Sequence, residues 1–165
     1  MGTTRVPAID GWFTMPEGAR AGDQDGVALI GTRCSGSGTY FFPPERVMSR
    51  APGFSDAELE EVQLSTRGRL WSYTDANYQP PDPYVPVTDP HVPFAIAAVE
   101  LEAERIVVMG QVVAGVTVED LRVGMEMELV LDTLFSEPSS EDGAQDGDTV
   151  EHMIWKWRPA EEAAR

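Results

Sequence analysis

The sequence contains little cysteine, lysine or histidine. Its 165 residues include one cysteine, Cys34, one lysine, Lys156, and two histidines, His91 and His152. A single cysteine excludes an intramolecular disulfide framework and a metal site built from four cysteines. A nucleophilic cysteine or serine needs a nearby base, and neither histidine stands in a recognisable order with one. We therefore expect no catalytic residues, and an independent hydrolase or thioesterase finds no support.

Positive charge is also scarce. The chain has 12 basic and 28 acidic residues, for a formal net charge of −16. Proteins that bind nucleic acid or anionic membranes need a basic surface. The acidity therefore argues against both partners.

Long apolar runs are missing, and so is a charged-then-apolar leader at the amino terminus. We therefore expect a cytoplasmic protein. The composition, 42% hydrophobic and 24% charged, is that of a globular protein of one compact domain with at most a small appendage.

The residues that are present predict a mostly β protein in several parts. Trp12 and Phe13 are expected to dock an amino-terminal arm, and a glycine turn at 34–38 between short apolar runs predicts a small ribbon. Ser55 to Glu58 has capping-box spacing, which predicts a short linker helix, although an acidic connector also fits. The expected parts are an arm at 1–25, a ribbon at 26–54, a linker helix at 55–61, a barrel at 62–159 and a polar tail at 160–165.

The barrel prediction rests on five strands after residue 62, with a short helix between the third and the fourth. That order is typical of the OB-fold, a small Greek-key barrel. Gly68 in the first strand indicates a bulge or strong bend, beyond which the two faces of the strand can exchange. The expected core consists of Leu64, Leu70, Phe94 or Val99, Val108, Leu129 and Trp157.

A loop at 79–93 contains six prolines. A loop of this length in a compact domain is often functional. Tyr84 and His91 give it hydrogen-bonding groups that suit a substrate entrance. A polyproline strap over the barrel fits equally well.

Several motifs in order resemble a known family over about residues 26–159. They are Cys34-Ser-Gly-Ser-Gly38, Tyr40-Phe-Phe-Pro-Pro44, Leu70-Trp-Ser-Tyr-Thr74, Val92-Pro-Phe-Ala-Ile-Ala-Ala-Val-Glu-Leu101, Leu121-Arg-Val-Gly-Met-Glu-Met127 and Trp157-Arg-Pro159. The family is the acyl-CoA-associated OB-fold proteins called domain of unknown function 35. The resemblance implies a rubredoxin-like zinc ribbon, a linker helix and an OB-fold.

The ribbon departs from that family at its metal site. The resemblance places the four zinc ligands at Cys34, Ser37, Met48 and Ala51, where only Cys34 is a cysteine. A hydroxyl and a thioether bind zinc poorly, and alanine does not bind it. We expect a degenerate, metal-free ribbon and no cofactor.

The resemblance implies a non-catalytic accessory subunit. Its partner would be a thiolase-like acyl-CoA enzyme, a thiolase or a retro-aldolase, as in steroid side-chain degradation, whose acyl-CoA channel the small subunit borders. The expected partner interface comprises Tyr40, Phe41, Phe42, Pro43, Pro44, Trp71 and Tyr73. The expected acyl-CoA contacts are Arg46, Arg50, Tyr84 and His91.

Other interpretations of these residues stay open. The aromatic ribbon can instead pack on its own barrel, and Arg46 and Arg50 can be solvated surface. Arg67, Arg69, Trp71 and Tyr73 on one strand face also suit a stand-alone OB-fold module for single-stranded nucleic acid. Two arginines do not outweigh a net charge of −16, so we favour a protein partner over nucleic acid. An outer sheet face covered by the linker or the amino-terminal arm fits these residues equally well.

Overall fold

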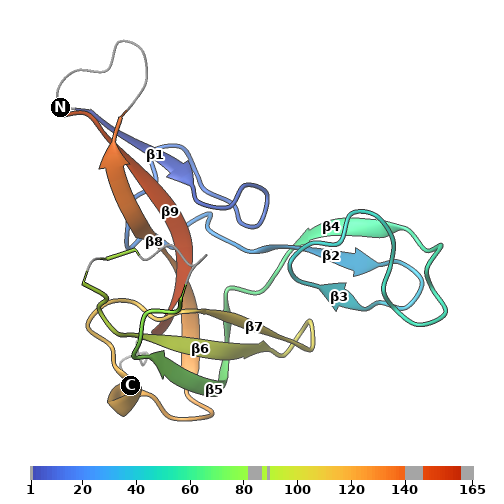
Figure 1. Ribbon diagram of the computed structural model, residues 1–165. Helices are drawn as coiled ribbons and strands as arrows, with labels where there is room; N and C mark the ends of the chain where they lie inside the picture. Colours follow the sequence, from blue (N-terminus) through green and yellow to red (C-terminus); the bar gives the residue numbers. More distant parts are fainter. Residues whose placement is uncertain (1, 82–86, 89, 140–146, 161–165) are drawn as a thin grey trace.

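The strands form two sheets (Figure 1) in a computed structural model that describes residues 2–81, 87–88, 90–139 and 147–160. One sheet has the order β1-β9-β8-β5-β6-β7, and the other has the order β3-β2-β4. The elements are β1 (Thr3–Pro7), β2 (Ile30–Cys34), β3 (Tyr40–Phe41), β4 (Leu59–Gln63), β5 (Arg67–Ala76), β6 (Phe94–Leu101), β7 (Ile106–Gln111), the 3-10 turn η1 (Val118–Asp120), β8 (Glu126–Pro138) and β9 (Thr149–Pro159). Within the described residues, no helix is long and apolar enough to cross a membrane.

Strands β5 to β9 make the barrel. Strand β5 pairs with β6 on one side and with β8 on the other. The sheet closes where Val112 bridges to Trp157 in parallel and the Val113 N–H donates to the Trp157 carbonyl at 3.0 Å. The turn η1 lies between the third and fourth barrel strands, as expected. This closed five-stranded order confirms the OB-fold.

The barrel interior is filled by side chains that alternate along the strands. Leu64, Leu70, Val99, Val108, Leu129 and Trp157 are each at most 3% exposed. Phe94, the alternative to Val99 in the expected core, is only half-buried. Alternating burial is what a strand with one face on a core requires, so the apolar pattern predicted this interior correctly.

Strand β5 contains the expected irregularity, but at another residue. The register between β5 and β6 shifts between Leu70 and Ser72, which puts the bulge at Trp71 and not at Gly68. Beyond the bulge, Tyr73 turns towards the core while Trp71 remains 61% exposed. The prediction that both aromatic residues share a face with Arg67 and Arg69 is therefore wrong for Tyr73.

Gly68 has a different role, which is close approach of two strands. A Cβ at this position would lie 2.3 Å from the Glu100 carbonyl oxygen and 2.7 Å from a Val99 methyl. We expect Gly68→Ala to lower the free energy of unfolding by about 1–3 kcal/mol, because backbone must move to relieve the overlap. Urea unfolding measures the change. Ser72→Ala, at an exposed position of the same strand, serves as the control and should change the value little; equal stability of the two variants would contradict the argument.

The predicted linker helix at 55–61 is wrong. Leu59–Gln63 is strand β4, which pairs antiparallel with β2 from Cys34 opposite Leu59 to Ile30 opposite Gln63. A helix of seven residues has little stability of its own, whereas pairing with β2 satisfies the backbone groups of both segments. The ribbon is consequently a three-stranded sheet that extends to Gln63, beyond the expected start of the barrel at residue 62.

The amino-terminal arm joins the barrel instead of lying loosely on it. Strand β1 adds to the large sheet in parallel with β9, and the buried Phe13 bridges to Leu29 just before β2. Further along, the Leu131 N–H donates to the Asp23 carbonyl at 2.9 Å, which holds the arm against β8. The arm thus connects both sheets and fixes the ribbon beside the barrel.

Candidate docking interface

Four aromatic rings lock the ribbon to the barrel. Phe42, which follows β3, packs edge-on against Trp155 of β9 and against Trp12 of the arm, with ring centroids 5.5 and 5.8 Å apart. Phe13 of the arm also packs edge-on against Trp155, with ring centroids 5.8 Å apart. Phe42, expected at the partner interface, therefore packs mainly within its own chain. The reason is that the short ribbon has too few apolar residues for a core of its own and uses the barrel instead.

The aromatic and proline segment also lines a groove. The groove has a volume of about 550 Å³ and runs between the ribbon and the start of β7. Its walls are Tyr40, Phe41, Phe42, Pro43, Pro44, Glu45, Arg50, Ile106 and Val107. All five ribbon residues expected at the interface, Phe42 included, therefore line one concave surface.

A second apolar surface continues from this groove across the outside of the barrel. Trp71, Val107 and Met109 are 61%, 43% and 66% exposed. Trp71 lies on β5, and Val107 and Met109 lie on β7; strand β6 runs between these two strands. Across the sheet, Ala98 of β6 pairs with Ser72, the residue after Trp71, on one side and with Met109 on the other. We call Trp71, Val107 and Met109 the docking face. Val107 belongs to both the docking face and the groove and makes them continuous.

The arginines near these surfaces are engaged with acidic side chains. Arg67 contacts Glu126 and Glu128, and Arg69 contacts Glu102 at 3.4 Å. Their charges are therefore largely balanced within the chain, which removes the basis for a phosphate-binding stripe on β5.

The two arginines expected to contact acyl-CoA are also paired. Arg46 lies 3.5 Å from Glu61 and donates to the Gly11 carbonyl at 3.0 Å, and Arg50 contacts Glu45 at 2.5 Å. Both arginine side chains are nevertheless largely exposed, Arg46 at 54% and Arg50 at 75%. Their contact with acyl-CoA stays a prediction.

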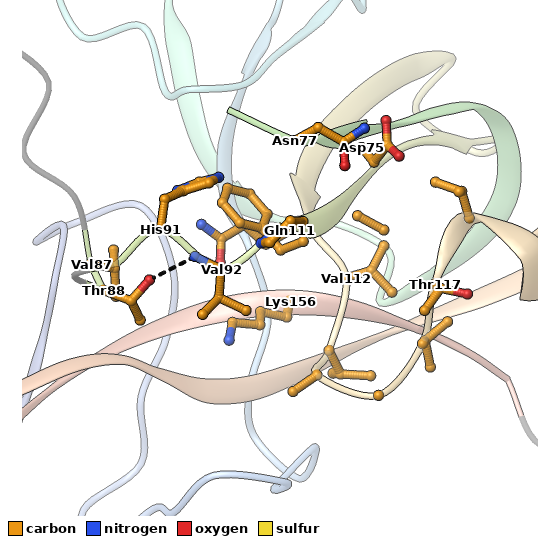
Figure 2. A pocket seen from close by; sticks show the side chains of 18 of the residues that line it. Asp75, Asn77, Val87, Thr88, His91, Val92, Gln111, Val112, Thr117 and Lys156 are labelled. Atoms are coloured by element: carbon orange, nitrogen blue, oxygen red, sulfur yellow. Dashed lines mark hydrogen bonds between the residues drawn. The ribbon is translucent and has the colours of Figure 1, made fainter. Parts of the chain in front are cut away.

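A cleft of about 490 Å³ opens at one end of the barrel. It is bordered by the end of the proline loop, the start of β6, the segment after β7, and Leu134 and Lys156 (Figure 2). His91 lies at this cleft, with its Nε2 2.8 Å from the Ala76 carbonyl oxygen. Tyr84, the other expected ligand contact in the loop, lies outside the described residues. Sequence reasoning identified His91 but missed Asp75, Asn77 and the segment 111–118, which only the barrel closure brings to the loop.

The degenerate metal site is a small hydrogen-bonded cluster. Cys34 is fully buried, and hydrogen bonds from Ser37 and Ser49 lower its pKa from 9.0 to about 7. Met48, at the expected third position, is 51% exposed, whereas its neighbour Ser49 is 3% exposed and hydrogen-bonds Cys34. The fourth position, Ala51, is buried.

This donor set does not fit zinc. One thiol, two hydroxyls and a methyl group replace the four soft or imidazole ligands that a structural zinc site requires. In the part of the chain that the structure describes, no three His, Cys, Asp or Glu side chains lie together as metal ligands would.

Stability without zinc follows as a prediction. We expect 1,10-phenanthroline to leave the thermal unfolding temperature unchanged, because Phe42 packing and the Cys34 hydrogen bonds hold the ribbon without metal. Differential scanning calorimetry with and without the chelator measures this. A metal analysis of the purified protein accompanies it, and stoichiometric zinc would contradict the prediction.

The fold defines a class of protein, an OB-fold barrel with a small three-stranded ribbon fixed beside it. The carboxy-terminal OB-fold domain model of ChsH2 matches residues 61–132. A DUF35 domain-containing scaffold protein of Methanocaldococcus jannaschii is 32% identical over 133 residues, which cover 81% of this chain and 82% of that protein.

The chain belongs to the DUF35 OB-fold family, as its motifs indicated. A solved structure titled as the Ltp2-ChsH2(DUF35) aldolase is similar with a TM-score of 0.50 and 23% identity, covering 80% of this chain and 84% of that one. This likeness confirms the fold.

Proposed function

We propose that this chain is a non-catalytic accessory subunit that docks on a thiolase-like enzyme, a thiolase or a retro-aldolase. The observation that carries the proposal is the docking face, where Trp71, Val107 and Met109 are exposed next to the groove. A relative is named a scaffold protein, and a structural neighbour is named as a chain of an aldolase. Both names support a role in assembly.

The docking face has the residue types of a protein interface centre. Tryptophan, tyrosine and methionine are enriched there, and a tryptophan that becomes fully buried is a common hot spot. A contiguous exposed apolar patch, rather than a single exposed side chain, marks a site of protein interaction.

Rigidity favours the same role. Phe42, Trp12 and Trp155 hold the ribbon against the barrel, and the arm is hydrogen-bonded to both sheets. The groove and the docking face are therefore formed before a partner arrives. Preformed surfaces lose less conformational entropy on binding, which increases affinity without further contacts.

The channel-bordering part of the proposal concerns the cleft. His91 and the apolar segment after β7 line an opening large enough for part of a bulky acyl group. We propose that the cleft borders the acyl-CoA channel of the partner, with steroid-like acyl-CoA as the substrate class.

Co-expression tests the proposed function. This chain is produced together with a thiolase-like enzyme from the same genome, and the mixture is analysed by size-exclusion chromatography with light scattering. We expect one peak that contains both chains, and lower solubility or activity of the enzyme when it is produced alone. An enzyme that is fully active, soluble and uncomplexed in the presence of this chain would contradict the proposal.

A further inference from the structure

The cleft at the end of the barrel combines apolar walls with a few polar groups. Its apolar surface comes from Val87, Val92, Pro93, Phe94, Ala95, Val112, Val113, Ala114, Val116, Val118 and Leu134. Its polar groups come from separate elements: Asp75 of β5 and Asn77 just after it, Thr88 and His91 of the proline loop, Gln111 of β7, Thr117 before η1 and Lys156 of β9 (Figure 2). A concave apolar site with few polar groups is the usual form of a small-molecule site.

The charge of Lys156, the lysine at the cleft, is paired with a carboxylate of the same chain. Lys156 is 12% exposed in its side chain, lies 2.9 Å from Asp132 and donates to the Thr133 carbonyl at 3.3 Å. It is therefore not available as a counterion for an anionic ligand. A phosphate or carboxylate in the cleft would have to share a cation that is already paired.

Asp75, unlike Lys156, has a charge that is not paired within the described chain. It lines the cleft, and among residues 2–81, 87–88, 90–139 and 147–160 its carboxylate and the Asn77 amide have no hydrogen-bond or ion-pair partner. A carboxylate accepts hydrogen bonds and repels anions. The His91 Nε2 lies 2.8 Å from the Ala76 carbonyl oxygen, and because a carbonyl oxygen only accepts, the ring donates there.

We propose that the cleft binds the uncharged, mainly hydrocarbon part of a ligand that carries a hydroxyl or amide N–H donor, and that Asp75 selects against carboxylates and phosphates. The inference deepens the proposed function, on which its place in an enzyme complex rests. Ligand binding itself is a property of this chain alone. The two can therefore fail separately.

A matched pair of probes tests the charge selection on the full chain. Decanol and decanoate are titrated at about pH 8, where the acid is ionised, and amide chemical shifts of residues 111–118 are followed by NMR. We expect decanol to shift these signals and decanoate to bind at least about ten-fold more weakly, as a carboxylate facing Asp75 requires. Equal binding of both probes, or binding of neither, would overturn the inference.

Substitutions locate the binding and its selectivity. Ala114 is an exposed wall residue, so Ala114→Trp should fill the cleft without harming the fold and weaken decanol binding about ten-fold or more. Ala103→Trp, in the exposed turn between β6 and β7, is the size-matched control and should leave binding unchanged. Asp75→Asn should raise the affinity for decanoate close to the affinity for decanol. Asp56→Asn, on the exposed ribbon turn, should leave the difference between the two affinities unchanged.

The outcomes separate the inference from the proposed function. Assembly with the enzyme subunit together with absent decanol binding overturns the inference and leaves the docking role standing. Decanol binding that Ala114→Trp weakens supports the inference even when no enzyme complex forms, in which case the docking role is overturned. Decanol binding that Ala114→Trp does not change places the ligand elsewhere and overturns the inference.

Discussion

Trp71→Ala is expected to weaken the complex with the thiolase-like enzyme by about 30-fold or more, because interface tryptophans typically contribute about 2 kcal/mol or more when truncated. Trp71 is 61% exposed in the isolated chain and stands in a bulge of β5, where no core side chain depends on it. The unfolding free energy should therefore change by less than about 0.5 kcal/mol. Loss of binding with unchanged stability is the distinguishing result.

A matched control separates the docking face from general surface hydrophobicity. Val123 is 68% exposed, but it belongs to neither the docking face nor the groove. Val123→Ala should leave the affinity for the enzyme unchanged, whereas Met109→Ala on the docking face should weaken it. Isothermal titration calorimetry measures all three variants. If Trp71→Ala and Val123→Ala bind equally well, the docking face is wrongly assigned.

Glu128→Gln is expected to destabilise the fold by about 3 kcal/mol, the usual cost of breaking a buried ion pair. Glu128 is 5% exposed and lies in β8 directly between Arg67 of β5 and Arg158 of β9. The two guanidinium groups donate to its carboxylate at 3.0 and 2.7 Å. A neutral amide leaves both charges without their partner at the place where three strands of the barrel meet.

The neighbouring carboxylate provides the control. Glu126 contacts Arg67 at 3.3 Å, but its side chain is 54% exposed. Solvent screens such a pair, so Glu126→Gln should cost less than about 1 kcal/mol. Urea unfolding of both variants measures the difference, and equal loss of stability would show that burial of Glu128 is not the cause.

The same carboxylate makes the fold sensitive to acid. Burial alone would raise the pKa of Glu128, but hydrogen bonds from Arg158, Arg67 and Gln24 outweigh it and lower the pKa below the ordinary 4.5. Its contribution to stability is therefore complete above the ordinary pKa and is lost as the pH falls through the lowered one. Glu128→Gln should lack this part of the acid destabilisation.

Much of the barrel was predictable because it depends on local alternation. The alternating apolar residues around Leu70, Val99 and Leu129 specify strands with one buried face, and their order with one helical turn specifies an OB-fold. The loss of zinc ligands around Cys34 was visible for the same reason, since it depends only on residue type. Such features need no knowledge of which segments meet.

Other features depend on pairing between distant segments and could not be predicted in this way. Residues 55–61 carry the local signals of a helix start, yet Leu59–Gln63 pairs with β2 about thirty residues earlier in the chain. The bulge of β5 lies at Trp71 and not at Gly68. Gly68 instead allows β5 to approach β6 closely. Phe42 was expected to contact a partner protein, but it packs against Trp155, which lies more than one hundred residues later in the chain.

By itself, the sequence determined the class of fold, the family and the absence of a basic surface or a four-cysteine site, because composition, alternation and motif order carry these properties. The tertiary structure decided which aromatic residues hold the ribbon and which remain exposed, and it assembled the cleft from all five barrel strands and the loops between them. Free energy of burial depends on what each side chain meets after the barrel closes. Trp71 and Phe42 are both aromatic residues that the sequence placed at the partner interface, but in the folded protein Trp71 is exposed and Phe42 packs against Trp155.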